Sequence, residues 1–186
     1  MCRLKRFLFM VKKALLAFIL LLALQQSRAQ VGVMKMVGKN TRDYSLGFGA
    51  YVQVGFPISE ADAVTAEIGV NFFFLHDGGS GNGTAMCPLK LGYRYSLNRT
   101  GYGFYLEPQA GYNLYGVTSK PDENGNVVNL KYHGVVLAAG LGYMFDMWQV
   151  PFDVRLRYET VIAHGGSNNM VSLGFTRSIG FRKKDN

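Results

Sequence analysis

The sequence predicts an all-β protein, an eight-stranded antiparallel up-and-down transmembrane β-barrel. Three observations predict it: segments of twelve to fourteen residues with alternating apolar and polar side chains, connections that alternate in length, and a leader-like N-terminus. Side chains of a β-strand point alternately to opposite faces, so each segment has one apolar face. Strands of soluble proteins usually have about five or six residues, whereas a tilted membrane strand needs about 9 to 11. The long segments therefore favour a membrane barrel over a soluble β-sandwich.

The N-terminal segment has the features of a secretory signal peptide. Its first thirteen residues carry five cations and no acid, and the apolar run Ala14–Leu24 follows. Small residues at Ser27 and Ala29 form a cleavage site, and the run is shorter than the roughly 20 apolar residues of a membrane helix. We therefore expect export through the general secretory pathway and cleavage after Ala29. The predicted regions are a signal peptide at residues 1–29 and an outer-membrane β-barrel domain at residues 30–186.

Removal of the signal peptide changes the charge of the chain. The full sequence has 20 Lys and Arg against 12 Asp and Glu, and six bases but no acid lie in the first 29 residues, so the mature balance is 14 − 12 = +2. This balance, without a clustered basic helix, argues against nucleic-acid binding. Cys2 leaves with the signal and Cys87 remains alone, so no intramolecular disulfide is expected. Met10 is an alternative start, since a complete signal follows it.

Seven segments keep their apolar alternation over ten or more residues, and each is a predicted strand. In Tyr44–Phe56, for example, the even-numbered residues are all apolar, while the odd-numbered residues include Ser45, Gln53 and three glycines. The apolar residues have even numbers in segments 44–56, 63–75, 102–115 and 148–160. They have odd numbers in segments 86–97, 134–145 and 170–181.

An eighth, weaker strand is predicted at Val31–Gly38, directly after the cleavage site. Its two faces are ambiguous in the sequence. Bacterial single-chain barrels have an even number of strands, because every backbone group in lipid must find an internal partner and seven strands would leave an open edge. The count therefore favours this strand.

The connections also fit a barrel. Outer-membrane barrels have short periplasmic turns and longer external loops. The glycine-rich segments HDGGSGNGTA and AHGGSNN and the region 122–126 are therefore expected outside the cell, with both termini in the periplasm. The expected connections are 39–43, 57–62, 76–85, 98–101, 116–133, 146–147 and 161–169, which alternate between long and short after the first.

The apolar face has aromatic residues near the strand ends and aliphatic residues in the middle. Such girdles are typical of proteins that cross a membrane, where aromatic rings lie at the two interfaces. The predicted interface aromatics are Tyr44, Phe74, Tyr112 and Tyr158 at the outer ends and Phe56, Tyr95, Tyr102, Phe145, Trp148 and Phe181 at the periplasmic ends.

The opposite face carries four acids and four bases. Buried charges are tolerated when they are paired, and an eight-stranded barrel is just wide enough for side chains to fill it. We therefore predict a neutral ion-pair network in the lumen, with Glu67 near Arg94, Arg94 near Tyr105 and Glu107, and inward glycines that make room for long side chains. The alternative is a solvated sandwich face. The predicted network comprises Glu67, Lys90, Arg94, Glu107, Asp153, Arg155, Arg157 and Glu159.

Two residues do not fit the outward face. Pro108 cannot donate a ladder hydrogen bond, which predicts a β-bulge there. Arg177 has lipid-facing parity and is expected at the periplasmic rim, because a cation at the midplane costs about 2 to 4 kcal/mol.

The sequence gives little sign of catalysis. His76, His133 and His164 fall at the predicted outer rim, and His164 shares a glycine-rich loop with Ser167, but no acid is placed by spacing to orient a histidine. No tight metal-ligand spacing occurs either. We therefore predict that the protein is not an enzyme and has no catalytic residue, metal site or cofactor.

From Val31 to Phe181 the chain resembles the small outer-membrane β-barrel family that includes the OmpA and OmpX type. The resemblance depends on GFYLEPQAGYNLYG, VVLAAGLGYMF and VSLGFTRSIGF, with their glycine–aromatic alternation, and on a final strand ending at Phe181. Family members commonly end on that aromatic, whereas here RKKDN follows it. The resemblance implies an integral protein of the Gram-negative outer membrane.

The expected function is non-enzymatic: a barrel with a side-chain-filled lumen that presents extracellular loops for surface interaction or envelope integrity. One alternative is an accessory barrel for transport or secretion, for example of a conjugation or protein-export apparatus, and another is an outer-leaflet lipid-modifying enzyme. Expected partners are outer-membrane lipid, the barrel-assembly machinery and an unidentified extracellular or periplasmic protein, with no nucleic acid.

Overall fold

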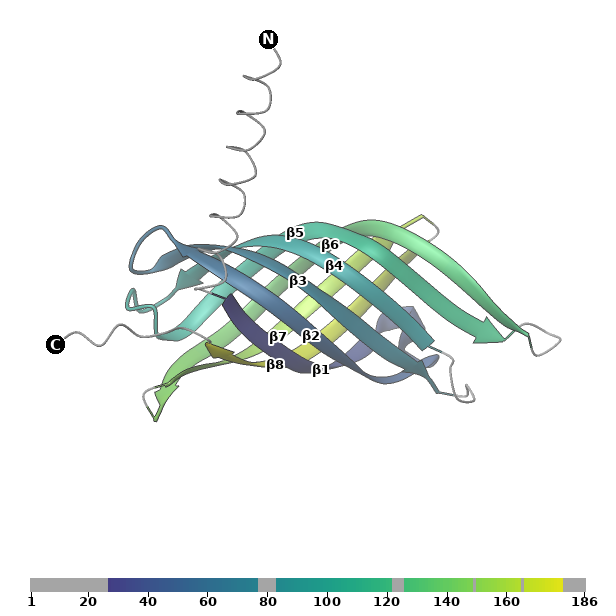
Figure 1. Ribbon diagram of the computed structural model, residues 1–186, viewed down its shortest axis with the longest axis horizontal. Helices are drawn as coiled ribbons and strands as arrows, with labels where there is room; N and C mark the ends of the chain where they lie inside the picture. The colour runs from purple at the N-terminus through teal and green to yellow at the C-terminus, as the bar shows by residue number, and fades with distance from the viewer. Residues whose placement is uncertain (1–26, 77–82, 122–125, 149, 165, 179–186) are drawn as a thin grey trace, which may run out of the picture.

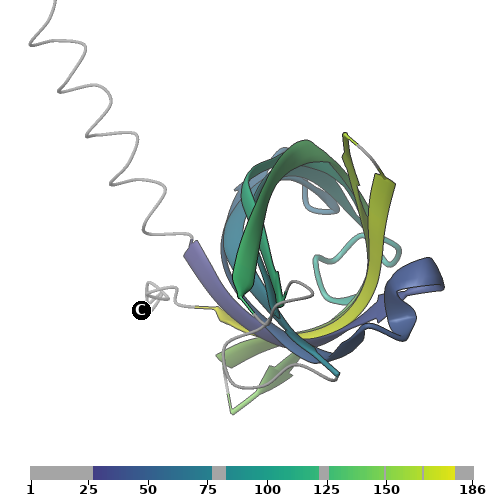
Figure 2. The ribbon, with the colours of Figure 1, turned by 90° about the vertical axis from the view of Figure 1, so that its right-hand side faces the viewer.

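The computed structural model describes residues 27–76, 83–121, 126–148, 150–164 and 166–178. These residues form a closed antiparallel β-barrel in which strands pair in chain order and β1 pairs with β8 (Figures 1 and 2). The predicted fold class is confirmed. The strands are β1 (Ser27–Val37), β2 (Tyr44–Pro57), β3 (Asp62–Leu75), β4 (Gly83–Ser96), β5 (Gly103–Pro121), β6 (Val127–Met147), β7 (Val150–Ala163) and β8 (Gly166–Ser178), and a short 3-10 helix, η1 (Gly38–Thr41), joins β1 to β2.

The barrel has two distinct ends. Figure 1 shows the start of β1 and the end of β8 at one end, which we call the near end. The β2–β3, β4–β5 and β6–β7 turns lie there as well, because the strands run up and down in chain order. The β1–β2, β3–β4, β5–β6 and β7–β8 connections lie at the opposite end, which we call the far end.

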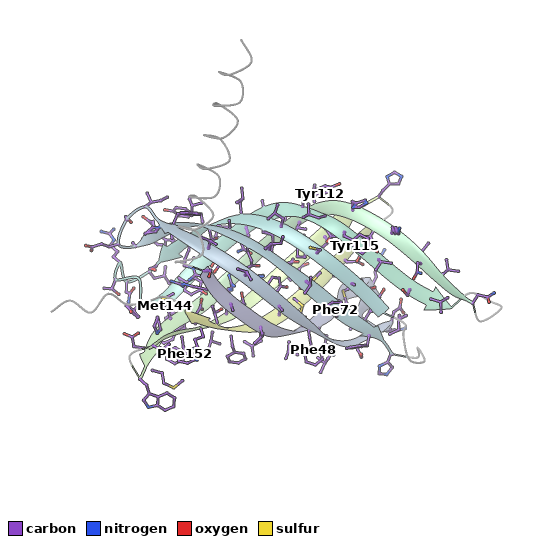
Figure 3. The ribbon with its side chains drawn as sticks, viewed as in Figure 1. Phe48, Phe72, Tyr112, Tyr115, Met144 and Phe152 are labelled. Atoms are coloured by element: carbon purple, nitrogen blue, oxygen red, sulfur yellow. The ribbon has the colours of Figure 1, made fainter. Side chains whose placement is uncertain are left out.

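The two faces of the wall have opposite polarity. Apolar side chains point outward: Leu91 is 63% exposed and Phe48 is 55% exposed. Figure 3 shows Phe48 and Phe72 projecting from the outer surface. Charged side chains point inward, where Glu67 and Lys90 are at most 1% exposed. This arrangement is the reverse of a water-soluble protein, whose charged residues are mostly exposed.

β1 closes the barrel, and its faces, ambiguous in the sequence, are now defined. Gln30, Met34 and Met36 are buried in the lumen, while Val31 and Val33 are exposed on the outside. The strand begins at Ser27, so the predicted cleavage after Ala29 falls within it. Residues 1–26 lie outside the described residues. Within the described part of the chain, no helix is long and apolar enough to cross a membrane.

The β5–β6 connection is shorter than expected. The prediction of a connection at 116–133 was wrong, because the ladder continues from Gly116↔Tyr132 to Pro121↔Val127. Pairing of β6 with β7 begins at Gly134, so the outer part of this hairpin projects beyond the wall (Figure 1). The end of the strand was predicted too early because of a β-bulge at Leu114 and Tyr115. The bulge interrupts the alternation of apolar and polar residues by which the strand was recognised.

The predicted bulge at Pro108 is also wrong. Pro108 pairs in register with Ala139 of β6, and the register shifts of β5 lie farther along, between Asn113 and Gly116. Because a bulge places two consecutive residues opposite one, Leu114 and Tyr115 both point outward and the parity of β5 reverses after them. The Cys87 backbone amide donates to Asn113 Oδ1 at 3.1 Å beside the bulge. The other unusual residue, Arg177, is exposed near the end of β8, at the near end.

Candidate functional site

The candidate site is the barrel lumen, which contains two different clusters of side chains. All eight charged residues of the predicted network point into it and are buried. They come from four strands: Glu67 from β3, Lys90 and Arg94 from β4, Glu107 from β5, and the remaining four from alternate positions of β7. A spacing of two residues keeps Asp153, Arg155, Arg157 and Glu159 on one face.

Glu67 is the centre of the network. Its carboxylate accepts a two-pronged contact from Arg157, with both N–O distances 2.7 Å. Lys90 Nζ lies 3.0 Å from Glu67 Oε1, and Arg155 Nη2 lies 3.2 Å from Oε2. Because β3 and β7 are four strands apart in a ring of eight, the Arg157–Glu67 pair joins opposite walls of the barrel. Fork-to-fork contacts of this kind are strong and directional.

A second acid, Glu107, extends the network toward the near end. Arg94 Nη2 and Arg155 Nη1 lie 2.7 and 3.1 Å from Glu107 Oε2. The amide of Gln53 joins the two acidic centres, since Nε2 donates to Glu107 Oε1 at 2.6 Å and lies 3.4 Å from Glu67 Oε2. Gln53 therefore belongs to the network, although it carries no charge and the sequence did not single it out.

Each end of the network has its own acid. Glu159 Oε2 is 2.5 Å from Lys90 Nζ. Asp153, at the near end, accepts a hydrogen bond from the Tyr105 hydroxyl at 2.5 Å and lies 3.4 Å from Arg94. The Arg94 guanidinium also stacks over the Tyr105 ring, 4.1 Å from its centroid. Four acids thus meet four bases across the lumen.

The contacts predicted for Arg94 are confirmed in part. Arg94 contacts Glu107 and Tyr105, as expected. Glu67, however, pairs with Lys90, Arg155 and Arg157. It is linked to Arg94 indirectly, through Gln53 and through Arg155 and Glu107. The reason is strand register: Lys90 lies directly opposite Glu67, whereas Arg94 lies opposite Ala63.

Inward glycines make room for the large lumen side chains. A Cβ at Gly69 would lie 2.2 Å from Tyr51 Cδ1, and one at Gly142 would lie 2.2 Å from Tyr105 Cζ. A Cβ at Gly140 would lie 3.2 Å from Arg155 Cδ. The expected role of the glycines thus extends to tyrosines as well as to charged side chains.

The far part of the lumen contains a cluster of apolar side chains that was not predicted. We call it the methionine cluster; its centre is Met34, Met36, Met86 and Met170, each at most 2% exposed. Tyr51 separates the two clusters: its ring lies 4.9 Å from Lys90 Nζ, and its hydroxyl lies 3.8 Å from Met34 Sδ. The sequence signal was Met34-x-Met36, whose spacing places both side chains on one face, but which face could not be decided without the barrel. The methionine cluster comprises Met34, Met36, Tyr44, Tyr51, Phe73, Met86, Val136, Val161 and Met170.

Tyr44 was predicted to lie at the membrane interface, and this prediction is wrong. Its side chain is buried in the methionine cluster, and Thr84 donates a hydrogen bond to its hydroxyl at 2.9 Å. A register shift between Tyr44 and Gly47 reverses the parity of β2 at this point. Tyr115, which was not predicted, is exposed near Tyr112 (Figure 3). Phe181 lies outside the described residues. Of the other eight aromatics, Tyr102 lies in the near-end turn before β5 and Trp148 in the near-end turn after β6. The remaining six lie on outward-facing strand positions: Phe56, Phe74, Tyr95, Tyr112, Phe145 and Tyr158.

The rim histidines are separate from the lumen. His76, His133 and His164 are exposed, and His133 Nδ1 lies 2.8 Å from the Leu114 carbonyl oxygen. Ser167, on the far-end part of β8, is exposed as well. Among the described residues, no group of three or more His, Cys, Asp or Glu side chains is arranged to hold a metal ion.

The closed ring of eight long strands with a filled lumen defines the small eight-stranded barrel fold of outer-membrane proteins. The structure is similar to the N-terminal barrel domain of Pseudomonas aeruginosa OprF, with TM-score 0.59, 13% identity, and coverage of 83% of this chain and 98% of that one. It is also similar to Ail, the attachment invasion locus protein of Yersinia pestis, with TM-score 0.58, 13% identity, and coverage of 83% of this chain and 99% of that one. Neisserial surface protein A (NspA) is similar as well, with TM-score 0.54, 13% identity, and coverage of 83% of this chain and 96% of that one. No family model matches the sequence, and no curated protein matches it.

Proposed function

We propose that this chain is an integral outer-membrane protein whose lumen does not conduct and whose far end makes contacts outside the cell. The observation that carries the proposal is the reversed polarity of the wall, with Leu91, Ile68 and Leu106 exposed outside and a charged network buried inside. Exposed apolar patches on soluble monomers rarely exceed a few hundred square ångströms. A continuous apolar outer wall is stable when acyl chains cover it.

The proposed orientation places the near end in the periplasm. Tyr95 and Tyr102 lie on the outer surface near this end, and Phe74, Tyr112 and Tyr158 lie on it toward the far end. Aromatic side chains prefer the two membrane interfaces, so these residues are proposed to form the two girdles. Arg177 then lies at the periplasmic rim, where its guanidinium can reach water.

The proposed lack of conductance is supported by the contacts across the lumen. Arg157 joins β7 to β3, and Arg155 joins β7 to both β3 and β5. The methionine cluster fills the lumen beyond them. A single-channel recording of the purified protein in a planar bilayer tests this directly. We expect no steady conductance; a steady open level would favour the transport or secretion alternative.

Membrane integration has a simple test. Folded barrels migrate faster in gels before boiling than after it, because the closed sheet resists the detergent. We expect the purified protein to require detergent and to show this shift. A protein that stays monomeric without detergent and migrates identically in both lanes would contradict the proposal.

The outer β5–β6 hairpin is the proposed contact surface. Val127, Val128 and Leu130 are exposed on both faces of the hairpin, beyond the last residues that pair with β7. Apolar residues on both faces of a projecting hairpin are typical of recognition elements rather than of a solvated loop. Ail, a protein of the same fold, is named for attachment and invasion, and NspA is named a surface protein.

Shortening this hairpin separates a surface role from an envelope role. A variant in which Asn-Gly replaces residues 119–129 keeps the Thr118↔Leu130 pair and uses a turn that suits two-residue hairpins. We expect normal barrel folding and normal resistance of the cells to detergent, but loss of adhesion to other cells. Unchanged adhesion would argue against the hairpin as the contact surface, and lost detergent resistance would favour an envelope role.

Export and assembly are further parts of the proposal. The mature protein is expected to begin at Gln30, which N-terminal mass spectrometry can test. Cleavage there removes the Ser27–Ala29 part of β1, which pairs with β2 and β8. Insertion is proposed to depend on the barrel-assembly machinery.

A further inference from the structure

Four of the methionines converge in the far part of the lumen. Among the described residues, the chain has six, and the remaining two, Met144 and Met147, lie toward the near end. Met36 lies directly opposite Met170 across the β1–β8 pair, and Met34 follows two residues away on the same face. Met86 enters from β4, where it lies opposite Asn71 of β3. Three strands, β1, β4 and β8, therefore supply thioethers to one cluster.

The side chain of Asn71 lies close to two of these sulfur atoms, those of Met170 and Met34. Asn71 Nδ2 lies 3.9 Å from Met170 Sδ. A Cβ built at Gly49 would lie 3.0 Å from Met34 Sδ and 2.9 Å from Asn71 Oδ1, so both groups border the same space. The Tyr51 hydroxyl contacts both Met34 Sδ and Asn71 Oδ1. Polar groups that hold ligand side chains in place are a usual feature around metal ions.

Apolar filling alone does not require methionine at these positions. The outer faces of the same strands carry Val, Leu and Phe, whose conformations are better defined. Soft sulfur ligands favour soft metals, Cu(I) among them. Thioether sulfur carries no charge, so a site built from methionine alone suits a soft ion of low charge. A monovalent ion adds only one charge to the lumen. The cations of the network nearest to the cluster, Lys90 and Arg157, are paired with Glu67 and Glu159.

We propose that the thioethers of Met34, Met36, Met86 and Met170 form a binding site for a soft monovalent metal ion, Cu(I) or its close analogue Ag(I). The ion enters from the far end and binds without a redox step. The site lies apart from the exposed histidines and from the ion-pair network, and it goes beyond the role proposed for the far-end hairpin.

The test uses Ag(I) as silver nitrate in chloride-free buffer, with the full-length mature protein in detergent micelles. Cys87 is free and partly exposed and would bind Ag(I) as a thiolate, so every protein carries Cys87→Ser. Methionine methyl groups labelled with ¹³C report on each thioether by NMR. We expect Ag(I) to shift the signals of the four cluster methionines and to leave those of Met144 and Met147 in place.

A matched pair of variants decides whether the cluster is the site. M36L/M170L removes two thioethers at nearly constant volume, and M144L/M147L removes two outside the cluster. We expect the first variant to lose the shifts of Met34 and Met86 and the second to keep them, with gel mobility confirming that both fold. Equal shifts in both variants would overturn the proposal. So would the absence of shifts in the Cys87→Ser protein refolded in the presence of Ag(I), because refolding removes any barrier to entry.

Discussion

The charged part of the lumen and the methionine cluster lie inside the same barrel but are held together by different forces. In the charged part, each carboxylate has named partners at defined distances, and Glu67 alone contacts three cations. In the methionine cluster, flexible thioethers fill the space by shape, with few hydrogen bonds. The two parts should therefore respond differently to substitution. Loss of one charged group leaves its partners with uncompensated buried charge and should lower the stability of the barrel. An apolar group can be replaced by another of similar volume with little change in stability.

The largest effect is expected for Glu67→Gln. The variant keeps the size of the side chain but leaves Glu159, 3.9 Å away, as the carboxylate partner of Arg157. Removal of one partner of a buried ion pair typically costs about 3 to 5 kcal/mol. Urea-induced unfolding from lipid vesicles measures the loss. Glu60→Gln, at an exposed near-end turn, is the control, and a similar small effect in both variants would show that the network does not stabilise the barrel.

A cation placed on the outer wall extends the comparison to lipid. Leu91→Arg puts a charge on the outward face with no acid opposite it, and we expect a cost of about 2 to 4 kcal/mol if the position lies near the bilayer midplane. Leu97→Arg, close to the near end, should cost about 0 to 1 kcal/mol. The same unfolding measurement applies. Equal costs at both positions would contradict the proposed placement of the barrel in the membrane.

Gly69→Ala tests the boundary between the two parts of the lumen. The new Cβ would lie 2.2 Å from Tyr51 Cδ1 and 2.6 Å from the Ala50 carbonyl oxygen, so Tyr51 must move away from both Lys90 and Met34. Overpacking of this kind costs about 1 to 3 kcal/mol. Gly55→Ala is the matched control, because nothing lies within 4 Å of its Cβ. If the two variants unfold at the same urea concentration, the position of Tyr51 is not important for stability.

The smallest effect is expected for Met170→Leu. A swap that conserves volume usually costs less than about 1.5 kcal/mol, and the Asn71 contact to the sulfur is long, at 3.9 Å. The unfolding midpoint should therefore stay close to that of the wild type. A loss as large as that of Glu67→Gln would mean that the methionine cluster is as specific as the ion pairs, and the comparison would fail.

The sequence determined the wall of this barrel. Outside the first strand and the register shifts of β2 and β5, the two-residue period separates lipid-facing from lumen-facing residues. The even strand count follows from the need to close the sheet in lipid. The eight charged residues were assigned to the lumen by this parity alone, and the structure places them there. The assignment of residues to the two faces depends on local geometry, which a single strand already contains.

The tertiary structure decided which residues meet across the lumen. Arg157 reaches Glu67 because β7 and β3 are opposite in the closed ring, which no spacing along the chain reveals. Tyr44 turns inward because a register shift in β2 reverses its parity, and Met36 meets Met170 because the first strand closes against the last. Contacts of this kind are set by register and closure, which are properties of the whole sheet, and so only the folded barrel could define them.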